Sequence, residues 1–307
     1  MNNLRMVTGS RAASESVGWI GAEAGIFRKH GLDVKFPSLE VGGPQAATGL
    51  ARGDWDFIQT GTVPIAEAVL NGGDPVILLR NHTPTASHVI LARQDICDLS
   101  ALTGKVVGVL TDTHSGQAGV IARSTIEKAG AVAKYQGLGT YRNIFNALGA
   151  SAIDAGILPL DYRFIGTSKY GLNVFDTPVS TLPTIFATTR RLIATDRDLV
   201  VRSVRALVES IHLFKTSKIT VLPLLQRFLN FDDIGAVDDV WNYYVPLLQA
   251  APRPSLAEAV TDVRGLFAKR YAMAQNMNEA DIVDQSIIDE VERSGFIKQL
   301  YGASNAS

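Results

Sequence analysis

Short apolar runs of strand length alternate with amphipathic helical patterns over the first 190 residues. The runs are bounded by Gly, Pro, Asn or Ser, as strands are. The predicted strands are Leu4–Thr8, Leu32–Phe36, Trp55–Gln59, Pro75–Leu79, His88–Arg93, 106–110, Ile153–Leu158 and Leu172–Phe175. Because strands and helices alternate along the chain, the pattern predicts an α/β sheet architecture.

Helical spacing of apolar residues predicts the elements between these strands. One helix is expected over Ser14–His30, with Gly31 as its left-handed C-terminal residue. Another begins at Gly42-Gly43-Pro44, where proline occupies the first turn. From about Asp196 the pattern changes to long helices, including 256–271 and 282–300, and no flexible linker marks a boundary.

Length and composition exclude several classes of protein. A chain of 307 residues favours two domains, and its 46% hydrophobic content excludes a disordered, collagen-like or coiled-coil protein. With 29 basic and 30 acidic residues, the chain has no excess of positive charge that would attract nucleic acid or an anionic membrane. The N-terminal segment does not read as a secretory leader. Either the protein stays in the cytoplasm, or its leader has been removed.

Two segments share the same spacing of residues where a helix gives way to a strand. They are Leu50-x-x-Gly53-x-x-Asp56-Phe57 and Leu148-x-x-Ser151-x-x-Asp154-Ala155. Any two helix-to-strand connections can look alike. The alternative interpretation is a pair of similar α/β lobes.

Catalytic and cofactor motifs are absent from the sequence. No Gly-rich phosphate loop, no His-Glu-x-x-His and no Gly-x-Ser-x-Gly occurs, and the five histidines lack metal-ligand spacing. Cys97 lies between Asp95 and Asp98, whose charges disfavour a thiolate, so we expect a structural thiol. The sequence predicts no catalytic residue, no metal and no cofactor.

Small polar loops instead follow the predicted strands in both halves of the chain. In open α/β sheets, ligands bind beyond the carboxyl ends of the strands. Helix N-termini there expose N–H groups that suit an anion or a carbonyl. Each loop alone is typical of helix capping, but their recurrence indicates a binding site. The loops are 9–11, 42–43, 60–62, 111–115 and 159–162.

Four segments carry a resemblance to a known family. They are GAEAGIFRKHGLDVKF (21–36), GLARGDWDFIQTGTVP (49–64), DLSALTGKVVGV (98–109) and VDQSIIDEVERSGFIKQLYG (283–302). In this order they resemble the solute-binding proteins of ABC importers, in the branch for nitrate, sulfonates, taurine and thiamine-type pyrimidines. The resemblance spans nearly the whole chain and says little about the ligand.

The resemblance implies a type II periplasmic-binding-protein fold. Two α/β lobes would be joined by crossovers near 80–87 and 181–187 and would close around one small ligand. Lobe one would comprise 1–84 plus 185–307, with the helical C-terminal third packed on it. Lobe two would comprise 85–184.

The family's contacting loops imply a set of ligand-binding residues. Arg11 would clamp a carboxylate or sulfonate, or else be a solvated loop arginine. His114 would donate to the ligand or lie at the surface, and Tyr162 is the aromatic expected at the cleft. The full set is Ser10, Arg11, Ser14, Gly42, Gly43, Thr60, Gly61, Thr62, Thr113, His114, Ser115, Asp161 and Tyr162.

The expected function is binding without turnover. The protein would capture a small organic, anionic or carboxylated solute and deliver it to an ABC permease. Glu15, Asp112 and Asp161 would instead suit a cationic or amide-bearing heterocycle. It would act as a monomer outside the inner membrane, its leader removed. The alternative is a cytoplasmic enzyme on the same fold, acting on a small aromatic or heterocyclic acid as a thiamine-pyrimidine synthase, a desulfinase or a decarboxylase would. Only Cys97 is present, and the first βα loop holds no cysteine, which argues against the first two of these activities.

Overall fold

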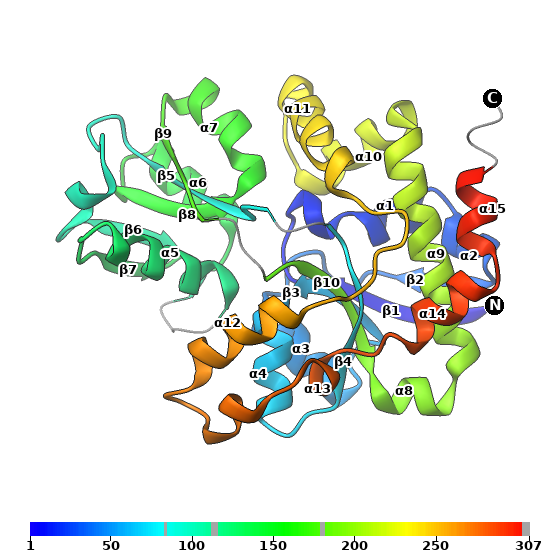
Figure 1. The fold of residues 1–307 in the computed structure, drawn as a ribbon. Helices are drawn as coiled ribbons and strands as arrows, with labels where there is room; N and C mark the ends of the chain where they lie inside the picture. Colours follow the sequence, from blue (N-terminus) through cyan, green and yellow to red (C-terminus); the bar gives the residue numbers. More distant parts are fainter. Residues whose placement is uncertain (83–84, 112–115, 179–181, 303–307) are drawn as a thin grey trace. The chain divides into compact units, whose positions relative to one another are not determined.

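The protein divides into two compact units, which are described separately (Figure 1). The computed structural model describes residues 1–82, 85–111, 116–178 and 182–302. Unit 1 consists of residues 1–83 and 181–307, and unit 2 of residues 84–180. That the predicted lobes, 1–84 plus 185–307 and 85–184, move as separate bodies stays a prediction.

Unit 1 is built on a five-stranded sheet in the order β2-β1-β3-β10-β4. β10 runs antiparallel between β3 and β4, whereas β1 is parallel to both β2 and β3. Thr184 at the start of β10 pairs with Gly61 at the end of β3. The start of β10 and the carboxyl end of β3 therefore lie at the same edge. The strands are β1 Asn2–Thr8, β2 Leu32–Lys35, β3 Phe57–Gly61, β4 Pro75–Arg80 and β10 Thr184–Thr189.

Helices cover both faces of this sheet, following the alternation of its side chains. Val7 and Ile58 belong to a core cluster shared with α3, α4 and α12. On the opposite face, the Gln59 side chain accepts a hydrogen bond from Gly18 N of α1 (2.9 Å), and α1 packs on α9. The helices of unit 1 are α1 Val17–Glu23, α2 Ile26–Lys29, α3 Gly43–Arg52, α4 Thr62–Leu70, α8 Arg190–Thr195, α9 Arg197–Thr216, α10 Lys218–Leu229, α11 Ile234–Tyr244, α12 Ala257–Phe267, α13 Glu279–Ile282, α14 Ser286–Arg293 and α15 Phe296–Gly302.

Unit 2 repeats this strand arrangement in the order β7-β6-β8-β5-β9. β6 is parallel to β7 and β8, and β5 is antiparallel to both β8 and β9. The antiparallel strand again occupies the fourth position. The elements of unit 2 are β5 His88–Ala92, β6 Val106–Val109, α5 Gln117–Lys128, β7 Lys134–Gly137, α6 Tyr141–Gly149, β8 Ala155–Pro159, α7 Arg163–Tyr170 and β9 Asn173–Asp176.

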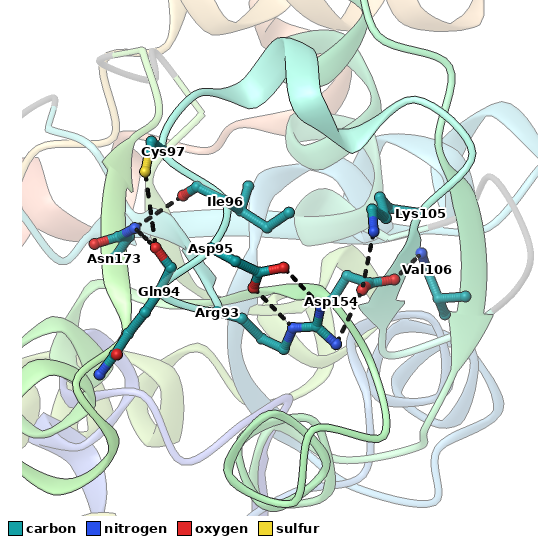
Figure 2. Close-up of polar contacts among 9 residues, drawn as sticks. All are labelled: Arg93, Gln94, Asp95, Ile96, Cys97, Lys105, Val106, Asp154 and Asn173. Carbon is teal, nitrogen blue, oxygen red and sulfur yellow. Dashed lines mark hydrogen bonds and ion pairs between the residues drawn. The ribbon is translucent and has the colours of Figure 1, made fainter.

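The two sequence segments that share the same residue spacing lie at equivalent places in the two sheets. Asp56 directly precedes β3 and accepts a hydrogen bond from Arg5 N of β1 (2.7 Å). Asp154 directly precedes β8 and accepts one from Val106 N of β6 (2.8 Å), as Figure 2 shows. The shared spacing thus corresponds to one local structure, used once in each unit.

Some predicted elements differ from the structure. The helix expected over 14–30 is divided into a short 3-10 helix, α1 and α2. Gly25 separates α1 from α2 because it takes a left-handed conformation (φ 82°). Gly295 (φ 77°) separates α14 from α15 within the helix expected over 282–300. β7 and β10 were not predicted as strands. None of the helices in the described ranges is both long and apolar enough to cross a membrane.

Candidate functional site

The predicted loops of unit 1 meet at the carboxyl ends of β1 and β3. Gly42 N donates to Gly9 O (2.9 Å), which holds the start of α3 against the loop after β1. A methyl group on Gly9 would lie 2.5 Å from Thr60 Oγ1, and one on Gly43 would lie 3.1 Å from the same atom. Glycine is therefore required for this close approach. The structure brings together Ser10, Gly42, Gly43, Thr60 and Gly61 at this edge.

Ser14 and Thr62 lie at the same edge, but their hydroxyl groups bond to protein atoms. Thr184 Oγ1 donates to Ser14 Oγ (3.0 Å), and Asn81 Nδ2 donates to Ser14 O (2.9 Å). Thr62 Oγ1 donates to Pro183 O (2.8 Å). Asn81 and Thr184 were missing from the predicted site. The available signal was their place in the two segments predicted as crossovers.

Arg11 contacts the end of a helix. Its Nη1 donates to Phe228 O (2.8 Å) and more weakly to Arg227 O (3.4 Å) in the last turn of α10. A guanidinium at a helix C-terminus is favourable because the last carbonyl groups lack helical partners and the dipole is negative there. The ligand clamp expected for Arg11 stays a prediction.

Replacing Arg11 tests this helix-end contact. Arg11→Ala is expected to lower the free energy of unfolding by about 1 kcal/mol, since it removes charged hydrogen bonds that are only partly buried. Urea unfolding followed by circular dichroism measures the loss, with Arg28→Ala on α2 as the control. If Arg11→Ala is as stable as wild type, Arg11 does not stabilise the end of α10.

Glu15 is a buried carboxyl group at this edge, absent from the predicted ligand-binding set. Its Oε2 accepts from Ser10 N (2.8 Å) and its Oε1 from Ser10 Oγ (2.9 Å). Burial raises the pKa of Glu15 to about 8, although the bonds from Ser10 act in the opposite direction. The carboxyl is thus mostly neutral at pH 7. Its stabilising contribution is complete below about pH 4.5 and is lost as the pH rises towards 8.

In unit 2, Asp161 and Tyr162 form a short 3-10 helix directly after β8. Asp161 is fully buried, and Tyr162 is 6% exposed. The Tyr162 ring packs edge to face on Phe145 of α6, with 5.2 Å between ring centroids. Tyr162 is therefore a packed side chain in this unit. Asp112, Thr113, His114 and Ser115 lie outside the described residues.

A chain of hydrogen bonds runs through His88 at the equivalent edge of unit 2. Nδ1 of the ring lies 2.8 Å from Ser87 Oγ, and Nε2 lies 3.0 Å from the Tyr141 hydroxyl. His88 pairs with Pro159 in the register of β5 and β8, which places it at the carboxyl end of β8. Burial lowers the pKa of His88 to about 4, so the ring is neutral at pH 7 and needs one donor and one acceptor partner. Neither Ser87 nor Tyr141 was predicted.

The opposite end of the unit 2 sheet carries the exposed Cys97 (Figure 2). Its Sγ lies 3.7 Å from Gln94 O in the segment after β5. Nearby, the Arg93 guanidinium pairs with Asp95 and Asp154. In the described parts of the chain, no three His, Cys, Asp or Glu side chains gather as a metal site would require.

Comparison with solved structures identifies the fold. The alkanesulfonate-binding protein SsuA from Xanthomonas axonopodis pv. citri, bound to MOPS, superposes with a TM-score of 0.74 at 16% identity, covering 93% of this chain and 99% of that one. The periplasmic nitrate-binding protein NrtA from Synechocystis PCC 6803 gives 0.71 at 9% identity, covering 96% and 89%. A cysteine-to-serine mutant of DszB, in complex with biphenyl-2-sulfinic acid, gives 0.62 at 13% identity, covering 95% and 99%.

At the level of sequence, no family model matches the chain. No curated protein matches it either. The predicted fold is nevertheless confirmed by the two α/β sheets and by structural neighbours that cover almost the whole chain. The chain has the type II periplasmic-binding-protein fold, which it shares with the sulfonate- and nitrate-binding proteins that its sequence resembles.

Proposed function

We propose that the protein binds a small organic oxyanion, with a sulfonate as the best candidate, and passes it to an ABC importer. The observation that carries the proposal is the cluster of Ser10, Gly43 and Thr60 at the carboxyl ends of β1 and β3. Backbone N–H groups and hydroxyl groups there suit an anion that needs several hydrogen-bond donors. Glu15 beside them is mostly protonated at pH 7 and so adds little negative charge.

The two neighbours that bind sulfonate and nitrate support this ligand class. Both are solute-binding proteins, which motivates the proposals of a transient ABC permease partner and an extracytoplasmic location. We also propose that the predicted lobes, 1–84 plus 185–307 and 85–184, are the parts that move when the ligand is captured. We propose that the other predicted site residues, including Asp161 and Tyr162 in unit 2, either contact the ligand or hold the residues that do.

Calorimetric titration with sodium ethanesulfonate tests the proposal. We expect saturable binding of one ethanesulfonate per chain and no product after prolonged incubation. The ligand at about 100 times its Kd is expected to add about 2.7 kcal/mol to the free energy of unfolding. Ethylammonium chloride, a cation of similar size, serves as the negative control. Equal binding of both ions, or of neither, would refute an oxyanion site.

A matched pair of variants locates the site on unit 1. Thr60→Val keeps the side-chain shape and removes a hydroxyl group, so it is expected to weaken ethanesulfonate binding about tenfold. Thr188→Val makes the same change to a buried threonine whose Oγ1 donates to Asp56 O, away from the proposed site. Its Kd is expected to stay at the wild-type value. If both variants weaken binding alike, the effect comes from general destabilisation.

A second candidate function is an enzyme on the same fold, favoured by the likeness to DszB and by Glu15 as a buried group able to exchange a proton near neutral pH. Incubation with biphenyl-2-sulfinic acid and measurement of released sulfite separates the two functions. Repeated turnovers that disappear in Glu15→Gln would establish the enzyme and exclude simple binding.

A further inference from the structure

We propose that Glu15 couples anion binding to proton uptake, because only its protonated carboxyl leaves the Ser10 hydroxyl hydrogen free to bond to the anion. The inference rests on the proposed function and deepens it. It makes Glu15 a positioning residue that acts through Ser10.

The hydrogen-bond geometry around Ser10 gives the first step. Ser10 Oγ lies 2.9 Å from Glu15 Oε1 and accepts from Ala12 N at 3.3 Å. A serine hydroxyl has one hydrogen to donate and two lone pairs. When Glu15 is ionised, that hydrogen must point to Oε1, since a carboxylate only accepts. When Oε1 carries a proton, it donates to Ser10 Oγ, and the serine hydrogen is released for another acceptor.

The second step is the position of this pair. Both residues are buried, with Ser10 6% and Glu15 7% exposed. A methyl group on Gly9 would lie 3.4 Å from Glu15 Oε2 and 2.5 Å from Thr60 Oγ1. The carboxyl therefore adjoins the backbone and hydroxyl groups proposed to hold the ligand.

The charged groups around Glu15 do not neutralise it. Glu40, in the segment before α3, acts on it with a like charge and raises its pKa. Arg11 on the same loop bonds to the end of α10. Other charged and titratable groups of the packed elements are paired or exposed. Arg227 of α10 pairs with Glu23 of α1, and Asp238 of α11 pairs with Lys218 of α10. Asp239 of α11 is exposed, and His82 after β4 packs on Tyr244 of α11.

Electrostatics gives the third step. A bound anion beside an ionised Glu15 would place two negative charges close together in a poorly solvated region, which is unfavourable. Anion binding and ionisation of Glu15 therefore oppose each other. Because linkage is reciprocal, the anion raises the pKa of Glu15 beyond its value of about 8 in the free protein. The favoured ligands are anions of strong acids, which carry no proton of their own near neutral pH.

The test is the pH dependence of ethanesulfonate binding, measured by calorimetry between about pH 6 and pH 9.5. The charge of this probe does not change over that range. For wild type we expect a constant Kd below about pH 7 and a rise approaching tenfold per pH unit above pH 8. Titrations in two buffers of different ionisation enthalpy are expected to show proton uptake that approaches one per anion at the highest pH.

Two variants isolate the contributions of the pair. Glu15→Gln mimics the protonated acid and is expected to keep the acid-side Kd across the whole range, with no proton uptake. Ser10→Ala removes the released donor and is expected to weaken binding about tenfold at pH 6. Circular dichroism verifies that both variants fold. If Glu15→Gln does not fold, the number of protons taken up by the wild-type protein still tests the proposal.

The outcomes separate this inference from the proposed function. Binding whose Kd and proton uptake do not change with pH overturns the coupling and leaves the oxyanion site intact. The same holds if Glu15→Gln retains the wild-type pH dependence. Absence of ethanesulfonate binding at every pH overturns the proposed function and the coupling together.

Discussion

Lowering the pH from 7 to about 4 is expected to remove about 3 kcal/mol of stability from unit 2 through His88 alone. Burial holds the pKa of His88 near 4, against 6.5 for the free side chain. Between these values the unfolded chain takes up a proton that the folded unit does not. The contribution is complete above about pH 6.5 and is lost as the pH falls towards 4, at about 1.4 kcal/mol per unit of pKa difference.

Denaturant unfolding of wild type and His88→Gln at pH 7, 6, 5 and 4 measures this loss. The stability difference between the two proteins is expected to shrink by about 3 kcal/mol over the range, because the variant lacks the titrating ring. Tyr141→Phe is the matched control. It removes the hydroxyl partner of Nε2 but leaves the ring buried, so it keeps the pH dependence. A difference that stays constant with pH would show that His88 titrates normally.

Gly21→Ala is expected to destabilise unit 1 by about 3 kcal/mol. Gly21 lies on α1, where it faces Ser210 of α9. The added methyl group would lie 1.8 Å from Ser210 Oγ and 2.6 Å from Ser210 Cβ. Ser210 is fully buried, so the two helices must move apart. The gain in helix propensity from glycine to alanine, about 1 kcal/mol, is smaller than this cost.

Gly265→Ala on α12 is the control for Gly21→Ala, since nothing lies within 4 Å of the added methyl group. Denaturant unfolding is expected to show this variant equal to wild type or more stable by up to about 1 kcal/mol. The double variant Gly21→Ala with Ser210→Gly should recover part of the loss. Equal stability of Gly21→Ala and Gly265→Ala would disprove the close packing of α1 on α9.

Local patterns in the sequence predicted the α/β sheets, and the family resemblance implied the type II fold that the structure confirms. Ser10, Gly43 and Thr60 lie at one edge, as expected, because each follows a strand and precedes a helix, and such loops share one edge of an α/β sheet. Their contact with a ligand stays a prediction. The break at Gly25 was missed because hydrophobic spacing continues across it. Periodicity alone does not distinguish a glycine inside a helix from one that ends it.

Some residues and contacts could not be predicted from local patterns because distant segments determine their surroundings. Asn81 and Thr184 contact Ser14 because β10 lies between β3 and β4, a pairing of segments more than 100 residues apart in the chain. The short 3-10 helix Ala13–Glu15, in which Glu15 is buried, contacts α10, α11 and β10, which lie far along the chain. The capping role of Arg11 depends on Phe228, which no local pattern connects to it.

The central place of β10 has a consequence for how the protein forms on the ribosome. Every strand of unit 2 has been synthesised before β10 emerges, so that unit can fold first. Until Thr184–Thr189 follows, β3 and β4 each have an unpaired edge, and such edges invite pairing with other chains. During synthesis, all the strands of the unit 2 sheet are therefore available for pairing before the unit 1 sheet has its fourth strand.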